Sequence, residues 1–401
     1  MQQLSGQDAS FIYSERPHAP THITSIGIYD QSTAPDGAVT FKGILARLEA
    51  CLHLARAFRQ KVVRVPGDFD HPWWVEDAEF DLEYHVRHIA LPRPGDWRQF
   101  CIQAARLHSR PLDLSRPLWE LSTKAGVNAL TVPGRSTRLA GRLVPGLGRA
   151  LQVQRKQSSG QLTGLAPATR FNGTVTAHRV LDARFYDFDD LKPMRHAVPG
   201  ATVNDVALSV LGGALRQYLL DAGELPEASL RAMTPVSVRT EEEKGAMGNQ
   251  VSAMLVSLAT DVADPVERLA AVHASTTASK EVTEAIGARS LTDLSQLAPG
   301  ALIGLGSRLA GQFARRDRGG VVNTVVTNVP GPREPLYFAG AEMLHMFGAG
   351  PVVDGMGLIN IVGSYERQFV LSFTADRGMM PDPARYAACI DGSFDALAAA
   401  T

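Results

Sequence analysis

The chain has 401 residues, 45% of them hydrophobic and 20% charged, and its 40 basic and 41 acidic side chains leave a formal net charge of −1. This length predicts two or three domains, the hydrophobic content excludes a wholly disordered chain, and the near-neutral charge argues against a general nucleic-acid binder. The three cysteines, Cys51, Cys101 and Cys389, lie far apart with no Cys-x-x-Cys pair, which excludes a disulfide framework and a cysteine zinc site and is typical of a reducing cytoplasm.

Short strands and helices alternate in the first 120 residues. We expect strands at 23–29, 61–65 and 73–75, and a helix at 41–58, where apolar side chains recur with helical spacing. Asp96 is a plausible N-cap for a second helix that runs to 107. This alternation predicts an α/β or α+β layered domain. The amino terminus has no signal-peptide pattern, and no apolar run reaches the about 18 residues that a membrane-spanning helix needs.

From 121 to 181 the composition changes, because this segment contains no Asp or Glu. Leu139, Leu143, Leu147 and Leu151 recur every four residues and predict an apolar stripe on a basic helix, with Pro145 as a kink. Two interpretations stay open: a helix on a membrane surface, or an interdomain linker whose leucines cover a core. In the first, the side chains that meet anionic headgroups are Arg135, Arg138, Arg142 and Arg149.

Strands and helices alternate again in the remainder of the chain, which predicts a second layered domain. Thr202 to Asp205 has capping-box spacing at the start of a helix that Gly223 can end, and Asp264-Pro265 begins another helix. Strands are expected at 251–258, 321–327, 358–364 and 368–374, the last two as a possible hairpin.

Common catalytic motifs are missing from the sequence. It contains neither a phosphate-binding Gly-x-x-x-x-Gly-Lys-Ser/Thr loop nor a Gly-x-Ser-x-Gly nucleophile elbow, and its Gly-x-Gly pairs lack the third glycine of a dinucleotide site. His85 and His88 would point to opposite faces if 84–90 is a strand, so a metal site there is not favoured. We therefore expect no metal.

Eight stretches, taken together and in order, resemble the bacterial wax ester synthase/acyl-CoA:diacylglycerol acyltransferases. They are Leu4–Ser10, His71–Asp77, Phe80–His88, Pro117–Glu120, Val203–Val206, Asn323–Pro332, Gly350–Gly357 and Met380–Pro383. The resemblance implies two acyl-CoA-dependent acyltransferase-like domains, similar in shape to chloramphenicol acetyltransferase, with a substrate tunnel between them. It also implies a His-His-x-x-x-Asp-Gly motif shortly after Pro117-Leu118-Trp119, whose histidine takes the proton of the acceptor hydroxyl.

The sequence departs from this family at the motif itself. None of its 11 histidines is adjacent to another, and Glu120 is followed by Leu121-Ser-Thr-Lys-Ala and the basic segment. The chain therefore looks internally shortened, and we assign no catalytic residue. The expected organisation is a shortened N-terminal acyltransferase-like domain at 1–120, a basic amphipathic linker at 121–168 and the C-terminal wax synthase/diacylglycerol acyltransferase domain at 169–401.

The surviving motifs supply the candidate site residues. Trp119 is expected to be a buried packing anchor, with a tunnel contact as the alternative, and Asn204 and Asp205 either cap a helix or shape the active site. Asn328 to Pro332 should form a rigid turn in the tunnel wall. The residues expected to shape the tunnel or active site are Pro117, Leu118, Trp119, Asn204, Asp205, Asn328, Pro330 and Gly331.

The resemblance implies an acyl-CoA-dependent O-acyltransferase of neutral-lipid synthesis, which forms triacylglycerol or wax ester at the cytoplasmic face of a membrane or a lipid droplet. Its partners would be acyl-CoA, diacylglycerol or a long-chain alcohol, and the lipid surface, with no nucleic acid and no cofactor beyond acyl-CoA as co-substrate. The alternative is a catalytically silent relative that binds acyl-CoA or lipid as a scaffold, because the histidine motif is missing.

Overall fold

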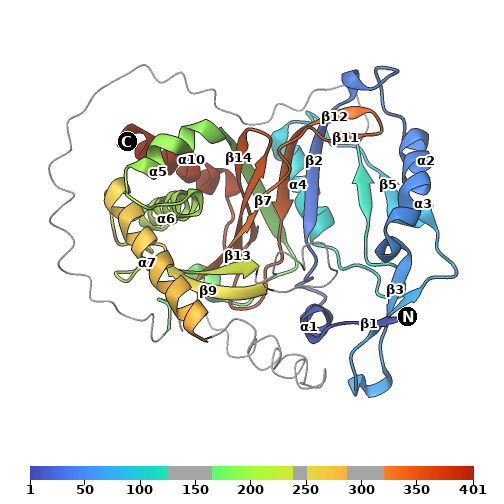
Figure 1. Cartoon of the computed structure of the whole chain (residues 1–401), viewed down its shortest axis with the longest axis horizontal. Helices are drawn as coiled ribbons and strands as arrows, with labels where there is room; N and C mark the ends of the chain where they lie inside the picture. Colours follow the sequence, from blue (N-terminus) through green and yellow to red (C-terminus); the bar gives the residue numbers. More distant parts are fainter. Residues whose placement is uncertain (125–164, 238–250, 287–319) are drawn as a thin grey trace.

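The computed structural model of the chain describes residues 1–124, 165–237, 251–286 and 320–401. We call residues 1–124 the first half and the described residues from 165 onward the second half. The two halves lie side by side, with the amino terminus in the first and the carboxyl terminus at the far end of the second (Figure 1).

The second half is built on one mixed six-stranded sheet with the order β7-β14-β13-β10-β8-β9. β10 runs parallel to β13 and β8, and the other neighbours pair antiparallel. The predicted hairpin is confirmed, because β13 and β14 pair along their whole length. The strands are β7 (Arg179–Asp187), β8 (Arg231–Ser237), β9 (Val251–Ser257), β10 (Thr324–Val329), β13 (Leu358–Tyr365) and β14 (Gln368–Asp376).

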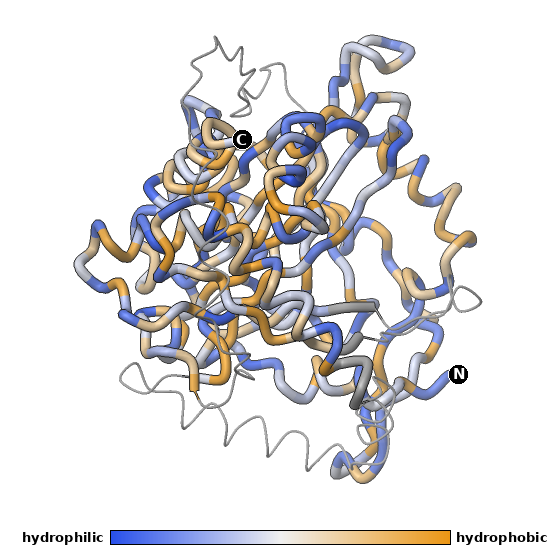
Figure 2. Tube along the Cα trace, turned by 60° about the vertical axis from the view of Figure 1, so that its left-hand side comes forward, coloured by the Kyte–Doolittle hydropathy of each residue, from blue (hydrophilic) through white to orange (hydrophobic). Residues whose placement is uncertain are grey.

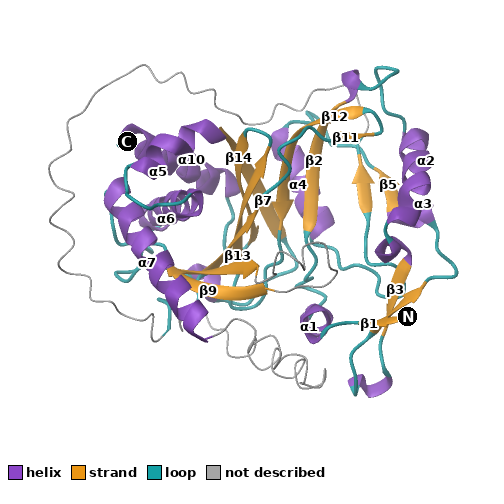
Figure 3. Ribbon diagram, viewed as in Figure 1, coloured by secondary structure: helices purple, strands orange, loops and turns teal. Residues whose placement is uncertain are grey.

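Helices cover one face of this sheet, as Figure 3 shows. They are α5 (Leu191–His196), α6 (Val203–Asp221), α7 (Pro265–Ile286) and α10 (Pro383–Ala399). α6 lies against α7 and α10 and is buried on nearly all sides from Val206 to Leu215. Gly212 permits this close packing, since a Cβ there would lie 2.1 Å from the carbonyl oxygen of Leu258. The largest cluster of buried apolar side chains is formed around this helix and the sheet.

The first half is divided among smaller sheets, with the orders β1-β4-β3, β11-β12-β2 and β5-β6. Its strands are β1 (Gln2–Gln3), β2 (Thr24–Asp30), β3 (Gln60–Val63), β4 (Trp73–Glu76), β5 (Val86–His88) and β6 (Leu121–Thr123). Its helices are α1 (Gly6–Ser14), α2 (Phe41–Cys51), α3 (Leu82–His85) and α4 (Trp97–His108).

One strand of the second half joins the two halves. β12 (Ala341–Ala349), preceded by β11 (Tyr337–Phe338), pairs antiparallel with β2 from Glu342↔Asp30 to Ala349↔Thr24. β2 and α4 then pack on the face of the large sheet opposite α6, where Phe347 and Phe185 lie among buried side chains from both halves. The second view shows hydrophobic residues spread through both halves (Figure 2). Several in the first half are nevertheless exposed, among them Leu54, Phe58 and Phe69.

The predicted helix starts are confirmed by the caps. The Asp96 carboxylate accepts the amide of Gln99, and the Asp264 carboxylate accepts the amides of Val266 and Glu267. Thr202 forms the predicted capping box, in which its hydroxyl and the Asp205 carboxylate each accept the other residue's amide. Each cap satisfies amides that have no partner inside the helix.

Two expectations about the first half are wrong. The helix predicted for 41–58 ends at Cys51 and is followed by two short 3₁₀ turns. The apolar residues after Cys51 keep helical spacing in the sequence, but they lie in these turns and not in the α-helix. Residues 84–90 are not one strand, because Asp81 caps a single helical turn that ends at His85, before β5. No sequence-based prediction covered β7, β12 or α10.

The predicted linker at 121–168 lies mostly outside the described residues. Its first three residues form β6, which pairs in parallel with β5, and at its other end the Ala166 amide donates to the Gly320 carbonyl. Arg135, Arg138, Arg142 and Arg149 all lie outside the described residues, so the membrane-surface helix and the domain boundary stay predictions.

Candidate functional site

Two groups of predicted site residues lie in the second half, one at Asn204 and Asp205 and the other from Asn328 to Gly331. The structure brings the two groups together at the first turn of α6. The Asn328 side chain, at the end of β10, donates from Nδ2 to Oδ1 of Asn204 over 3.4 Å. Asn328 is exposed and Asn204 is partly exposed. The two amides therefore present hydrogen-bonding groups at an accessible end of the sheet, although 124 positions separate them in the chain.

The turn after Asn328 is held against β13. A Cβ at Gly331 would lie 2.0 Å from the Ser364 carbonyl oxygen, so only glycine fits there without a shift of the backbone. The Gly331 amide also donates to the Ser364 hydroxyl over 3.2 Å, and Pro330 is exposed beside it. These contacts fix Gly331 against β13, and the rigid turn in a tunnel wall stays a prediction.

Asp205, next to Asn204, is almost completely buried and has several hydrogen-bond donors. Its Oδ1 accepts from the Thr276 hydroxyl over 2.7 Å, and its Oδ2 lies 3.0 Å from Nδ1 of His273 and accepts the Thr202 amide over 2.8 Å. Burial by itself would raise the pKa of this carboxyl. Hydrogen bonds from Thr276, the Thr202 amide and His273 outweigh burial, so the pKa of Asp205 is below its usual value. Asp205 therefore caps α6 and also binds α7.

His273 is a residue that the sequence reasoning missed. It lies on α7, 68 positions from Asp205, and its side chain is 27% exposed. No spacing rule relates a helix cap to a histidine so far away, so only the packing of α7 on α6 reveals the pair. The result is a histidine whose ring is oriented by a buried carboxylate.

The third group of predicted residues, Pro117 to Trp119, lies in the first half. Trp119 packs as predicted, but it is partly exposed rather than buried, and its indole N–H donates to the Phe58 carbonyl over 2.9 Å. Its ring stacks on His85 with centroids 4.6 Å apart, and it also contacts the rings of Phe58 and Phe80. This stack fixes Trp119 directly before β6.

His85 in that stack is buried. Its Nδ1 lies 2.7 Å from the Trp119 carbonyl, so that nitrogen carries the proton, and its Nε2 is buried with no partner among the described residues. Because aromatic rings enclose His85, it serves the packing of Trp119 rather than reaching an accessible surface. His88, on β5, stacks on Phe41 instead, so the two histidines do not form a metal pair.

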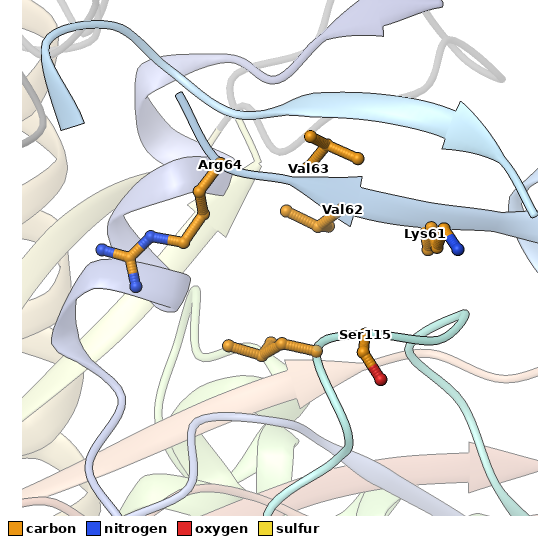
Figure 4. Close-up of a pocket in the computed structure, with 6 residues that line it drawn as sticks. Lys61, Val62, Val63, Arg64 and Ser115 are labelled. Atoms are coloured by element: carbon orange, nitrogen blue, oxygen red, sulfur yellow. The ribbon is translucent and has the colours of Figure 1, made fainter. Parts of the chain in front are cut away.

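A pocket of about 450 Å³ lies near this region, between β3 and the segment before Pro117 (Figure 4). It is lined by Lys61, Val62, Val63, Arg64, Leu114 and Ser115. Lys61 is paired with Asp77 at 2.8 Å and Arg64 with Asp68, so both of its cations already have anionic partners. The lining contains no nucleophile–base pair, and we assign no chemistry to this pocket.

Within the described residues no group of three or more His, Cys, Asp or Glu side chains could hold a metal ion. No described helix is long and apolar enough to cross a membrane.

Two family models match the chain. The wax ester synthase/diacylglycerol acyltransferase catalytic domain matches residues 4–132, and the C-terminal domain of the same enzymes matches residues 247–398. A putative diacylglycerol O-acyltransferase of Mycobacterium tuberculosis is 31% identical over 415 residues, which covers 88% of this chain and 90% of that protein. The chain belongs to the wax ester synthase/diacylglycerol acyltransferase family. The predicted family is thereby confirmed.

Solved structures confirm the fold of this family member. The wax ester synthase/diacylglycerol acyltransferase of Marinobacter aquaeolei VT8 has a TM-score of 0.72 at 24% identity, covering 99% of this chain and 98% of that one. A variant of the starter condensation domain of rhizomide synthetase, in complex with C8-CoA and Leu-SNAC, has a TM-score of 0.52 at 13% identity, covering 100% and 94%. The predicted α/β fold with two acyltransferase-like domains is confirmed.

The alignment with the M. tuberculosis relative also bears on the shortened first domain. It covers 88% of this chain yet runs over 415 positions, more than the 401 residues of the whole chain. That relative therefore has residues with no counterpart in this family member. The shortening after Glu120, where the histidine motif is missing, stays a prediction.

Proposed function

We propose that this family member is an acyl-CoA-dependent O-acyltransferase of neutral-lipid synthesis, which transfers an acyl chain to diacylglycerol or to a long-chain alcohol. The family membership along almost the whole chain carries this proposal. The six-stranded sheet, its helices and the Asn204–Asn328 pair support it, because they form an ordered second half with an accessible polar end.

The reaction joins a hydroxyl oxygen to the thioester carbonyl and releases the thiol of coenzyme A. A base must accept the hydroxyl proton, and donors must stabilise the oxyanion of the tetrahedral intermediate. The Asn204 and Asn328 amides are candidates for donors. Removing a positioned base commonly costs about 10² to 10⁴ in rate, so we expect turnover well below that of relatives with the histidine motif.

The missing motif specifically favours a second candidate, a catalytically silent relative that binds acyl-CoA or lipid as a scaffold. Binding needs an apolar site of suitable shape rather than a base. The two candidates differ in one observable, which is the release of thiol from acyl-CoA when an acceptor alcohol is present.

Two measurements on the full chain separate them. Calorimetry with palmitoyl-CoA measures binding, and thiol release with hexadecanol or a diacylglycerol measures turnover. Slow turnover with ester formation supports the acyltransferase, and binding without any turnover supports the scaffold. Failure to bind palmitoyl-CoA contradicts both.

We propose peripheral association with the cytoplasmic face of a membrane or with lipid droplets through Arg135, Arg138, Arg142 and Arg149, each contributing about 1 kcal/mol near anionic lipid. Replacing all four with Ser should release the protein from anionic vesicles at moderate salt. Unchanged vesicle binding would favour the linker interpretation of that segment.

A further inference from the structure

His273 and Asp205 have the geometry of a general base and the group that orients it. Nδ1 of the imidazole lies 3.0 Å from Oδ2 of the buried carboxylate. The carboxylate is itself held by the Thr276 hydroxyl and by the capping box of Thr202. In general base catalysis by histidine, a carboxylate bound to one ring nitrogen holds the imidazole in place. The other ring nitrogen can then accept a proton.

The charge of Asp205 decides which nitrogen of His273 is available. Its several hydrogen bonds favour the ionised carboxylate, which can only accept, so Nδ1 of the neutral imidazole carries the proton. Nε2 then presents a lone pair. The orienting bond thus leaves His273 ready to accept a proton at Nε2.

Nε2 faces a position where the chain has no side chain. A Cβ at Gly200 would lie 3.2 Å from Nε2 and 3.6 Å from Cε1 of His273. Gly200 also has a φ of +85°, which L side chains rarely adopt. The His273 side chain is 27% exposed. Because residue 200 is a glycine, no side chain of that residue covers the Nε2 edge of the ring, and another molecule can approach it.

Other described histidines lack this combination. His85 is enclosed by aromatic rings, and both nitrogens of the buried His108 are bonded, one to the Thr24 hydroxyl and one to the Gly350 carbonyl. His18 lies 3.5 Å from Asp354, and the Arg16 guanidinium already forms an ion pair with that carboxylate at 3.1 Å.

The pair also adjoins the polar end of the second half. Asp205 follows Asn204 directly, so one helical turn carries the carboxylate that orients His273 and the amide that contacts Asn328. His273 itself lies on α7 and Asn328 on β10, so this turn links a proton acceptor and an amide donor from two other elements. Acyl transfer needs both kinds of group.

We propose that His273, oriented by Asp205, is the general base for acyl transfer in this shortened chain. This inference rests on the proposed acyltransferase function. Nε2 takes the proton of the acceptor hydroxyl while its oxygen bonds to the thioester carbonyl carbon. As the tetrahedral intermediate collapses, the carbon–sulfur bond breaks and the imidazolium returns the proton to the departing thiolate. The products are an ester and free coenzyme A, with His273 regenerated.

The test compares full-length wild-type protein with His273→Ala, using palmitoyl-CoA and hexadecanol and measuring both thiol release and ester formation. We expect His273→Ala to lower kcat by about 100-fold or more, with palmitoyl-CoA binding by calorimetry unchanged. Free imidazole should restore turnover in His273→Ala in proportion to its concentration. A purely structural histidine would not show this rescue, because added imidazole supplies a base and not a helix contact.

His345→Ala is the matched control, since its Nδ1 lies 2.8 Å from the Gln368 side chain rather than from a carboxylate. This variant should keep wild-type turnover and show no response to imidazole.

Unchanged turnover in His273→Ala would overturn the inference and leave the proposed function standing. The same holds for a loss of turnover that imidazole does not restore although palmitoyl-CoA still binds. Wild-type protein that binds palmitoyl-CoA without releasing thiol would overturn the inference and support the scaffold. Wild-type protein that does not bind would contradict the proposed function as well.

Discussion

The two halves of this protein contain similar kinds of elements but pack them differently. In the second half, one six-stranded sheet and the helices on its face share a single large cluster of buried side chains. In the first half, β2 and α4 join the opposite face of that sheet, whereas the cluster around Leu4, Ala9 and Tyr13 is small. The β5–β6 pair forms a sheet of its own within the described residues.

The halves therefore differ in how much apolar surface they bury. A sheet buries apolar surface where another layer packs on its face, and its edge strands leave backbone groups without partners in the sheet. In the first half, the strands are divided among smaller sheets, and large side chains such as Phe69 are exposed. We therefore expect the halves to unfold separately, with the β3–β6 region of the first half opening before the second half.

The largest effect should come from the core of the second half. Leu211→Ala removes a fully buried side chain on α6 and should lower the free energy of unfolding by about 4 kcal/mol, measured by urea denaturation. Leu220→Ala, near the end of the same helix and 50% exposed, should cost far less. Leu4→Ala should shift only the first-half transition, and a single transition that moves with both Leu4→Ala and Leu211→Ala would contradict the separation of the halves.

The next prediction concerns the contact between the halves. His108, at the end of α4, is buried, its Nε2 donates to the Gly350 carbonyl and its Nδ1 accepts from the Thr24 hydroxyl. Burial lowers the pKa of His108 from 6.5 to about 4. The unfolded chain therefore binds a proton at a higher pH than the folded one. The stability that neutral His108 provides is present above pH 6.5 and is lost as pH falls toward 4, by about 3 kcal/mol at most.

Urea denaturation of the wild type and of His108→Gln between pH 8 and pH 4 measures this contribution. The variant should be less stable at pH 8, because it lacks the imidazole contacts, but its stability should depend less on pH. An identical pH dependence in the two proteins would show that the contact between the halves does not depend on the neutral imidazole.

The smallest effects should come from the same substitution at two helix caps. Thr202→Ala breaks the capping box of α6 and should cost about 2 kcal/mol in the second-half transition, because the buried Asp205 loses a donor as well. Thr40→Ala removes the cap of α2, where the hydroxyl accepts only the Gly43 amide, and should cost about 0.5 kcal/mol in the first-half transition. Equal losses of unfolding free energy in the two variants would contradict this prediction, because they would show that the two caps stabilise their halves to the same extent.

Limited proteolysis tests the boundary between the halves without any substitution. The acid-free composition of 121–168 predicts that the first cuts fall within this segment. First cuts within 202–222 or 321–332 would mean that the boundary is wrong.

The sequence by itself determined the features that depend on neighbouring residues. Helix starts at Asp96, Thr202 and Asp264 followed from side chains that cap amides two or three positions ahead, and the β13–β14 hairpin followed from two β-rich runs with a short turn between them. The ordered motifs determined the family, and the lack of adjacent histidines marked the departure from it. Each of these is a short-range pattern that can be read along the chain.

Tertiary structure decided which distant residues meet. The pairing of β12 with β2, the contact of Asn328 with Asn204 and the bond between His273 and Asp205 join positions from 68 to more than 300 residues apart. No spacing in the sequence encodes these contacts, because they arise only when α7 packs on α6 and β12 crosses to the first half. The sequence therefore identified Asp205 as a helix cap, whereas its packing against α7 gave it a histidine to orient.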